Sequence, residues 1–233
     1  MKLTNKILLV FLILLVLLIT AYKIVFNSIV ELVPSGTDKK ADYIYRILPL
    51  TETPIEAIEI KGRFIVEFIK DDSVLAAING PDNLVNNYIA VEREGNKILI
   101  RSKIDLTKYY HPISIRFNMK FLRTIVLSNG AVASMEKFDG DLLNITLEDS
   151  TVFNAASSKI VQTNITGRET STAIISKTKN ASVRLSDESN LLLTIDGGEV
   201  SGTIDEKADF GLEGNVKKNS IIKVKEETNK GEK

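Results

Sequence analysis

The sequence of 233 residues contains no cysteine, no tryptophan and one histidine, His111. Without cysteine the chain has no disulfides, no thiolate nucleophile, no Fe–S cluster, no Cys-bound zinc and no lipid attached to a cysteine. With one histidine, the side chain that most often acts as general acid or base is nearly missing. The composition therefore favours a protein that is not an enzyme and needs no cofactor.

Charge of either sign is not in excess, because thirty basic residues balance thirty acidic ones. Proteins that bind nucleic acid usually carry a basic surplus, so nucleic acid is not an expected partner. Isoleucine, valine, leucine, threonine and serine are plentiful instead, which is typical of β-structure with polar turns.

The longest apolar run is Ile7–Ile19, which follows a short basic segment, residues 1–6. Extended to residues 7–26, with Lys23 reaching toward the interface, it is long enough to cross a hydrocarbon core of ~30 Å. We predict an uncleaved single-pass membrane anchor whose basic end lies in the cytoplasm. The alternative is a cleaved signal peptide ending near Ala21. Both interpretations place the rest of the chain outside the cytoplasm, in the periplasm or at the cell surface.

Three further segments follow the anchor. Residues 27–54 include Pro34, Gly36 and several charges and are predicted to form a linker. Residues 55–225 form the predicted β-domain. Residues 226–233 are charged and have no apolar period, so we expect a disordered tail.

A block of about twenty residues recurs through the second half of the chain. Its first apolar position falls at 125, 145, 165, 183 and 202, with a weaker sixth copy near Ile222. Each copy has three short apolar points separated by polar turns, as a parallel β-helix with coils ~4.8 Å apart requires. An antiparallel β-sandwich also gives alternation, but it has no reason to align residue types at this period. The predicted inward core positions are Ile125, Leu127, Ile145, Leu147, Ile165, Val183, Leu185, Ile204 and Ile222.

The region before the repeats shows shorter signals. Alternation predicts strands over Ile58–Phe68 and Ile113–Phe117. Residues 89–91 and 98–100 are expected to pair across Glu94-Gly95-Asn96 as a hairpin, and Asn83–Tyr88 is expected to form a short helix.

These features together resemble the auto-transporter adhesin head domain family, also called the GIN domain family. The likeness lies in Ile58–Phe68, Asn96–Arg101, Ile113–Phe117 and Leu122–Ala131, followed by the repeats. The resemblance implies a bacterial envelope protein whose residues 55–225 form a single-stranded, right-handed parallel β-helix. Later copies carry charged turns where the family has small ones, so the sequence departs from the family pattern there.

Acidic residues recur at the first turn of four copies, at Asp149, Glu169, Asp187 and Glu206. Stacked carboxylates could bind Ca²⁺, or two of them could act as the acid pair of a glycoside-cleaving enzyme. The turns of such a fold are also its most solvated part, and a charged, soluble rim is the simpler interpretation. We therefore treat the four residues only as weak calcium candidates and predict no catalytic or cofactor-binding residue.

One aromatic cluster, Tyr109-Tyr110-His111-Pro112, falls outside the alternation. It could form a contact patch, or it could cover the end of the core, where an open stack of strands needs protection.

The sequence as a whole predicts a membrane-tethered, extracytoplasmic module for adhesion, binding or structure at the cell envelope, without enzymatic activity. Its expected partners are the membrane and an extracellular polymer or protein, and association of identical copies through a flat β-face or a free edge is also compatible with the pattern. The alternative is a β-helical carbohydrate-active enzyme, either a glycoside hydrolase or a lyase. A signalling accessory is disfavoured because six residues before the apolar run cannot fold into a domain.

Overall fold

The computed structural model describes residues 42–50, 54–73, 75–109, 111–218 and 220–225. The chain divides into two compact units, Met1–Ala41 and Asp42–Lys233, and all described residues belong to the second. Among them, no helix has the length and apolar character that crossing a membrane requires. The transmembrane helix that we expected is thus not part of the described fold, and residues 7–26, where we placed it, lie outside the described residues.

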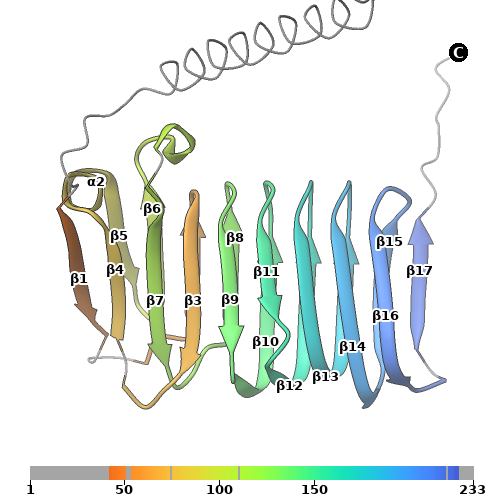
Figure 1. The fold of residues 1–233 in the computed structure, drawn as a ribbon. Coiled ribbons are helices and arrows are strands. Elements are labelled where there is room, and N and C mark those ends of the chain that lie inside the picture. The colour runs from red at the N-terminus through yellow and green to blue at the C-terminus, as the bar shows by residue number, and fades with distance from the viewer. Residues whose placement is uncertain (1–41, 51–53, 74, 110, 219, 226–233) are drawn as a thin grey trace, which may run out of the picture. The chain divides into compact units, whose positions relative to one another are not determined.

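Strands dominate the described residues (Figure 1), with one short α-helix, α2 (Asp82–Tyr88), and one 3-10 turn, η1 (Leu106–Lys108). The strands are β1 (Tyr43–Pro49), β2 (Ala57–Lys61), β3 (Phe64–Lys70), β4 (Leu75–Pro81), β5 (Ile89–Glu94), β6 (Lys97–Ser102), β7 (Ile113–Met119), β8 (Thr124–Ser128), β9 (Val132–Glu136), β10 (Asp139–Leu147), β11 (Val152–Ala155), β12 (Lys159–Gly167), β13 (Thr172–Leu185), β14 (Asn190–Gly198), β15 (Val200–Asp205), β16 (Asp209–Val216) and β17 (Ile221–Lys225).

All of these strands belong to one mixed sheet. Three of its pairings are antiparallel: β1 with β4, β4 with β7, and β5 with β6. The prediction of a single-stranded parallel β-helix is therefore wrong. Helical winding requires every strand to run the same way, whereas here the tight turn at Gly95 (φ 61°) and the segment around α2 reverse the chain.

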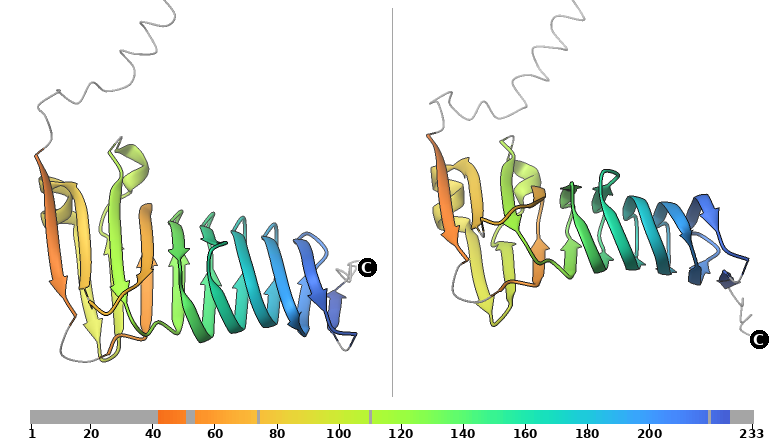
Figure 2. Two further views of the ribbon diagram at one scale, coloured as in Figure 1. Left: turned by 60° about the horizontal axis from the view of Figure 1, so that its bottom comes forward. Right: turned by 90° about the horizontal axis from the view of Figure 1, so that it is seen from below.

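The remaining pairings are parallel. Together with the β1–β4 and β4–β7 pairings they form two ladders, which Figures 1 and 2 show as strands following one another in chain order through the second half of the chain. Ladder one has the order β6, β2, β8, β10, β12, β13, β15, β17. Ladder two has the order β1, β4, β7, β3, β9, β11, β13, β14, β16, and its first two pairings are antiparallel. The long strand β13 takes part in both ladders.

The register of ladder one follows the sequence period. Ile125 pairs with Ile145, Ile145 with Ile165, and Ile165 with Val183. The same row continues through Gly202 to Ile222, and in the other direction it runs through Ile58 to Ile98. Isoleucine or valine side chains therefore stack at the strand spacing along this row, except at Gly202, and each strand covers the inward face of its neighbour.

The inward side chains of both ladders meet in one hydrophobic cluster. Phe68 and Phe117 stack within it, with ring centroids 5.4 Å apart and an interplanar angle of 13°. Burial of each such aliphatic or aromatic side chain is worth about 1.5–3 kcal/mol, so the stacked columns supply most of the stability. Of the predicted core positions, all are buried except Ile222, which is partly exposed in the last strand of ladder one.

The turns after β8, β10, β12 and β13 each contain a residue in the left-handed region, namely Asn129 (φ 59°), Asp149 (55°), Glu169 (56°) and Asp187 (58°). Asn and Asp tolerate this conformation better than other non-glycine residues, which accounts for their recurrence in the sequence. A buried small residue follows two or more positions later, at Thr151, Ser171 and Ser189, because the tight corner leaves no room for a larger side chain.

Elements before the repeats form largely as their local patterns predict. The hairpin β5–β6 pairs Val91 with Ile100 around Gly95, and helix α2 begins at Asp82. Strand β1, however, lies within residues 27–54, the range assigned to a linker, and pairs along its whole length with β4.

Candidate functional site

The outward face of ladder one is polar and periodic. Side chains two apart in a strand lie on the same face, so the positions flanking each inward isoleucine point outward. In register, these outward positions form two columns of amides, hydroxyls and one guanidinium: Asn144, Asn164, Ser182 and Ser201 in the first, and Thr146, Thr166, Arg184 and Thr203 in the second.

A chain of amide hydrogen bonds orients the first column. Gln162 Nε2 donates to Asn164 Oδ1 at 3.1 Å, and Asn164 Nδ2 donates to Asn144 Oδ1 at 2.8 Å. Asn144 Nδ2 in turn donates to the carbonyl oxygen of Arg123 at 3.2 Å. Each amide donates in the direction of Arg123, so this series of hydrogen bonds holds the amides against the sheet. Gln162 takes part in it through Nε2 and not through Oε1.

Two adjoining hollows lie on this face, and we call them together the polar groove. The larger has a volume of about 690 Å³ and is lined by Gln162, Lys179, Asn180, Glu199, Ser201 and Lys217, among others. The smaller, about 280 Å³, is lined two residues further along the same strands by Asn164, Thr166, Ser182, Arg184, Gly202 and Thr203, among others.

Backbone contacts shape the floor of the polar groove. Asn180 Oδ1 accepts a hydrogen bond from the backbone N–H of Glu199 at 3.1 Å, and Ser220 Oγ accepts one from Val200 at 3.0 Å. Gly202 has φ 151°, and a Cβ there would lie 1.8 Å from the carbonyl oxygen of Val183. The strand can thus approach its neighbour closely only because this copy of the repeat has glycine in place of isoleucine or valine.

The charged residues lining the polar groove are mainly basic: Lys179, Arg184 and Lys217, against Glu199. Together with the amides and hydroxyls, they present many hydrogen-bond donors and several acceptors on an open surface.

The four calcium candidates occupy one column of turns, but three or more ligands do not converge there. Asp187 Oδ2 accepts hydrogen bonds from the backbone N–H of Glu169 at 3.3 Å and from Ser186 Oγ at 3.1 Å. A hydrogen bond with Asp149 and the charges of nearby carboxylates raise the pKa of Glu169 above its ordinary value. Within the described part of the chain, no group of three or more acidic or histidine side chains could hold a metal ion.

Around the predicted aromatic cluster, the structure adds residues that sequence reasoning missed. The ring of His111 meets Tyr43 edge to face, with centroids 5.9 Å apart. Tyr43, Tyr45 and Ile47 point outward from β1 and are 50%, 60% and 58% exposed. The alternation Tyr43, Tyr45, Ile47 could have indicated a strand, but the range was assigned to the linker as a whole.

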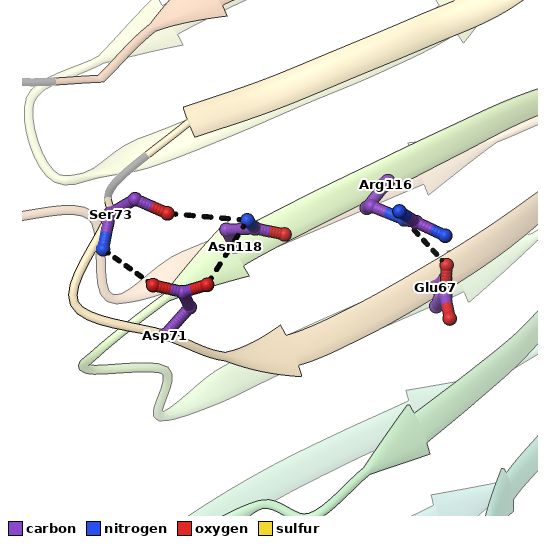
Figure 3. Close-up of polar contacts among 5 residues, drawn as sticks. All are labelled: Glu67, Asp71, Ser73, Arg116 and Asn118. Carbon is purple, nitrogen blue, oxygen red and sulfur yellow. Dashed lines mark hydrogen bonds and ion pairs between the residues drawn. The ribbon is translucent and has the colours of Figure 1, made fainter.

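A second polar cluster, drawn in Figure 3, lies on ladder two and the turn after β3. Glu67 Oε2 accepts from Arg116 Nε at 2.7 Å, across the pairing of β3 with β7. Asp71 accepts from the backbone N–H of Ser73 at 2.8 Å, and Asn118 Nδ2 donates to Ser73 Oγ at 3.2 Å. The bonds from Ser73 lower the pKa of the Asp71 carboxyl, and the cluster fixes the turn between β3 and β4.

A buried carboxylate on ladder one has a structural role. Glu59 lies between Lys61, 2.6 Å away, and Lys97, which it also contacts. Burial acts to raise the pKa of Glu59, but hydrogen bonds from both lysines outweigh it and the pKa is lowered. Lys61 and Lys97 thus stabilise the ionised carboxylate of Glu59 although its side chain is largely buried.

Neither a protein-family model nor a curated protein sequence matches the chain, so membership of the GIN domain family stays a prediction. Solved structures with a similar fold do exist. A candidate adhesin from Bacteroides fragilis is 14% identical with a TM-score of 0.56, over 83% of this chain and 98% of that one. A candidate lipid-binding protein from Parabacteroides distasonis is 16% identical with a TM-score of 0.54, over 78% of this chain and 96% of that one. At these identities, the likeness shows the fold alone.

Proposed function

We propose that the protein is a non-enzymatic, extracytoplasmic binding module whose polar groove holds an extended, hydroxyl-rich polymer such as a polysaccharide. The observation that supports this most is the periodic outward face of ladder one. Its amides and hydroxyls repeat at the strand spacing of ~4.8 Å, and the two hollows of the groove follow them.

The chemistry of the groove suits such a ligand. Asn180 and Gln162 can both donate and accept, as sugar hydroxyls do, while Lys179 and Arg184 donate to hydroxyl or carboxylate oxygens. The groove is open, whereas sites for small molecules enclose most of the ligand surface. An open groove lets a long chain pass along the face.

The names of the similar structures agree with a binding role and suggest two ligand classes, adhesion targets and lipids. A lipid between the ladders would have to displace the hydrophobic cluster that already fills the interior. The larger hollow of the groove is lined mainly by polar side chains, which favours a polar polymer over an acyl chain.

The carbohydrate-active enzyme is the weaker proposal. Glycoside hydrolysis uses two carboxyl groups on either side of the scissile bond. The described residues that line the groove include one carboxylate, that of Glu199. The column of acidic residues lies elsewhere, in the turns. This composition supports binding without cleavage.

Export is part of the proposal. The apolar run Ile7–Ile19 behind a basic start is typical of a segment that directs a chain out of the cytoplasm. If residues 42–233 reach the cell surface, protease added to intact cells should digest them. If they stop in a periplasm, protease should digest them only after the cells are converted to spheroplasts. Protection in both preparations would contradict export.

The binding proposal is tested on a glycan array with residues 42–233, followed by calorimetry on the polymers that bind. Replacing Lys179 and Arg184 together by alanine should weaken binding by roughly tenfold or more, since a hydrogen bond from a charged group contributes about 1.5–3 kcal/mol. Replacing Arg63 and Lys103 together by alanine is the charge-matched control, since both are exposed basic residues outside the groove, and it should leave binding unchanged. Equal loss in both variants, or release of shortened glycans, would contradict the proposal.

A further inference from the structure

Ladder two has an outward face unlike that of ladder one. On five consecutive strands it exposes one branched apolar side chain each: Ile65 (50%), Val132 (46%), Val152 (39%), Ile174 (37%) and Leu192 (37%). We call these five residues the apolar stripe. Isolated apolar side chains are common at protein surfaces, whereas a contiguous row marks a contact surface.

The strand register makes the stripe contiguous. Ile65 is the partner of Val132, and Val132 is the partner of Val152. Ile174 stands diagonally next to Val152, beside Asn154, and Leu192 is the partner of Ile174. A Cβ on Gly211 in the next strand would lie 2.9 Å from Leu192 Cδ1, so the leucine lies over that glycine and ends the row.

Acidic side chains border the stripe at Glu136, Asp209 and Glu213, whereas the positions immediately beside it on its own strands are nearly free of charge. These positions are Ser134, Asn154, Thr172, Asn190 and Glu67, and Glu67 is neutralised by Arg116 at 2.7 Å. Charged groups repel their own kind across a two-fold axis, but amides and hydroxyls both donate and accept. The flanks can therefore form hydrogen bonds with identical flanks.

We propose that the apolar stripe is the interface of a homodimer, in which ladder two of one copy packs face to face on ladder two of a second copy. The area is adequate: nine strands at ~4.8 Å and about five residues at ~3.3 Å give a face of about 700 Å², close to the ~800 Å² per partner of a stable interface. Two such faces pack ~10 Å apart with their strands nearly aligned. The proposal is independent of the polar groove, which lies on ladder one.

The geometry singles out one residue. Val152 lies in β11, the middle strand of the five. If one stripe covers the other, an in-plane two-fold axis brings Val152 of one copy opposite Val152 of its partner.

Since the chain contains no cysteine, single-cysteine variants report on this geometry without background. The full-length chain with Val152→Cys, oxidised in the cells that produce it, should give a reducible band at about twice 25.8 kDa. Val161→Cys is the matched control and should remain at the monomer mass, because Val161 is also an exposed valine (48%) but lies in β12, outside ladder two.

A second variant separates the interface from folding. Val152→Lys places like charges at the axis and should convert the dimer to a monomer in sedimentation velocity, with an unchanged circular dichroism spectrum. A monomeric wild-type chain, equal cross-linking of Val152→Cys and Val161→Cys, or a cross-link to a different protein would each overturn the proposal.

Discussion

At the residue scale, the left-handed turn positions determine which side chains recur. Asn129, Asp149 and Asp187 suit φ values near 55–60°, whereas Glu169 does not have a side chain that favours this region. Glu169 also carries its carboxylate close to that of Asp149. It is therefore the least favourable residue of the acidic column.

The titration of Glu169 gives a prediction with a defined sign. Its pKa in the folded protein is raised above the ordinary 4.5, first by the hydrogen bond with Asp149 and then by carboxylate charges. The hydrogen bond between protonated Glu169 and Asp149 therefore stabilises the fold fully at pH values below the pKa of Glu169 in the unfolded chain. This stabilisation is lost as the pH rises through the pKa of Glu169 in the folded protein. Glu169→Gln should raise the urea midpoint at pH 7, and the difference from wild type should shrink toward pH 4.

Urea titrations of the 42–233 fragment at both pH values measure this difference. Glu188→Gln, an exposed glutamate in a neighbouring turn, serves as control and should change neither midpoint. A stabilisation by Glu169→Gln that is equally large at pH 4 would show that the raised pKa is not its cause.

At the element scale, strands β8, β10, β12, β13 and β15 show how far a repeat specifies packing. The sequence period predicts that equivalent residues stack, and the register pairs them so. The exception is Gly202, where the period predicts an isoleucine-like residue. The close approach of β15 to the carbonyl of Val183, visible only in the folded chain, requires glycine there.

Restoring the repeat at this position should therefore destabilise the protein. Gly202→Val forces φ 151° on a β-branched residue and places its Cβ against the Val183 carbonyl oxygen. We expect a loss of about 2–4 kcal/mol in the free energy of unfolding, measured with urea. Thr203→Val, on the outward face next to it, should cost less than about 1 kcal/mol. A Gly202→Val variant as stable as wild type would mean that β15 does not approach β13 so closely.

At the scale of the whole molecule, the strands before the repeats decide the topology. The parallel columns extend into β2 and β6, while β4 and β5 run against their neighbours. Strand β1 is antiparallel to β4 and therefore runs in the same direction as β7. An open parallel stack would leave unpaired N–H and C=O groups at its first strand. In this fold the reversed strand β4, followed by β1, continues ladder two beyond β7.

Strand β1 accordingly has a testable role. A fragment that begins at residue 50 lacks β1 and leaves β4 with a free edge, including the backbone opposite Tyr45. Compared with the fragment that begins at residue 42, it should melt at lower temperature and aggregate at lower concentration, since exposed edges pair with other chains. Light scattering during thermal melts measures both effects. Identical curves for the two fragments would show that β1 does not protect the edge.

The sequence alone determined the local elements and the columns: the hairpin at Gly95, the helix near Tyr88, and the row from Ile125 to Val183. These depend on side-chain period and turn chemistry, which act over a few residues and repeat at each copy. Only the tertiary structure decided the strand directions before the repeats, the inclusion of β1 in the sheet, and the convergence of Gln162, Lys179 and Lys217 in one groove. Such features depend on which segments meet across long loops, and alternation is the same for a strand paired in either direction.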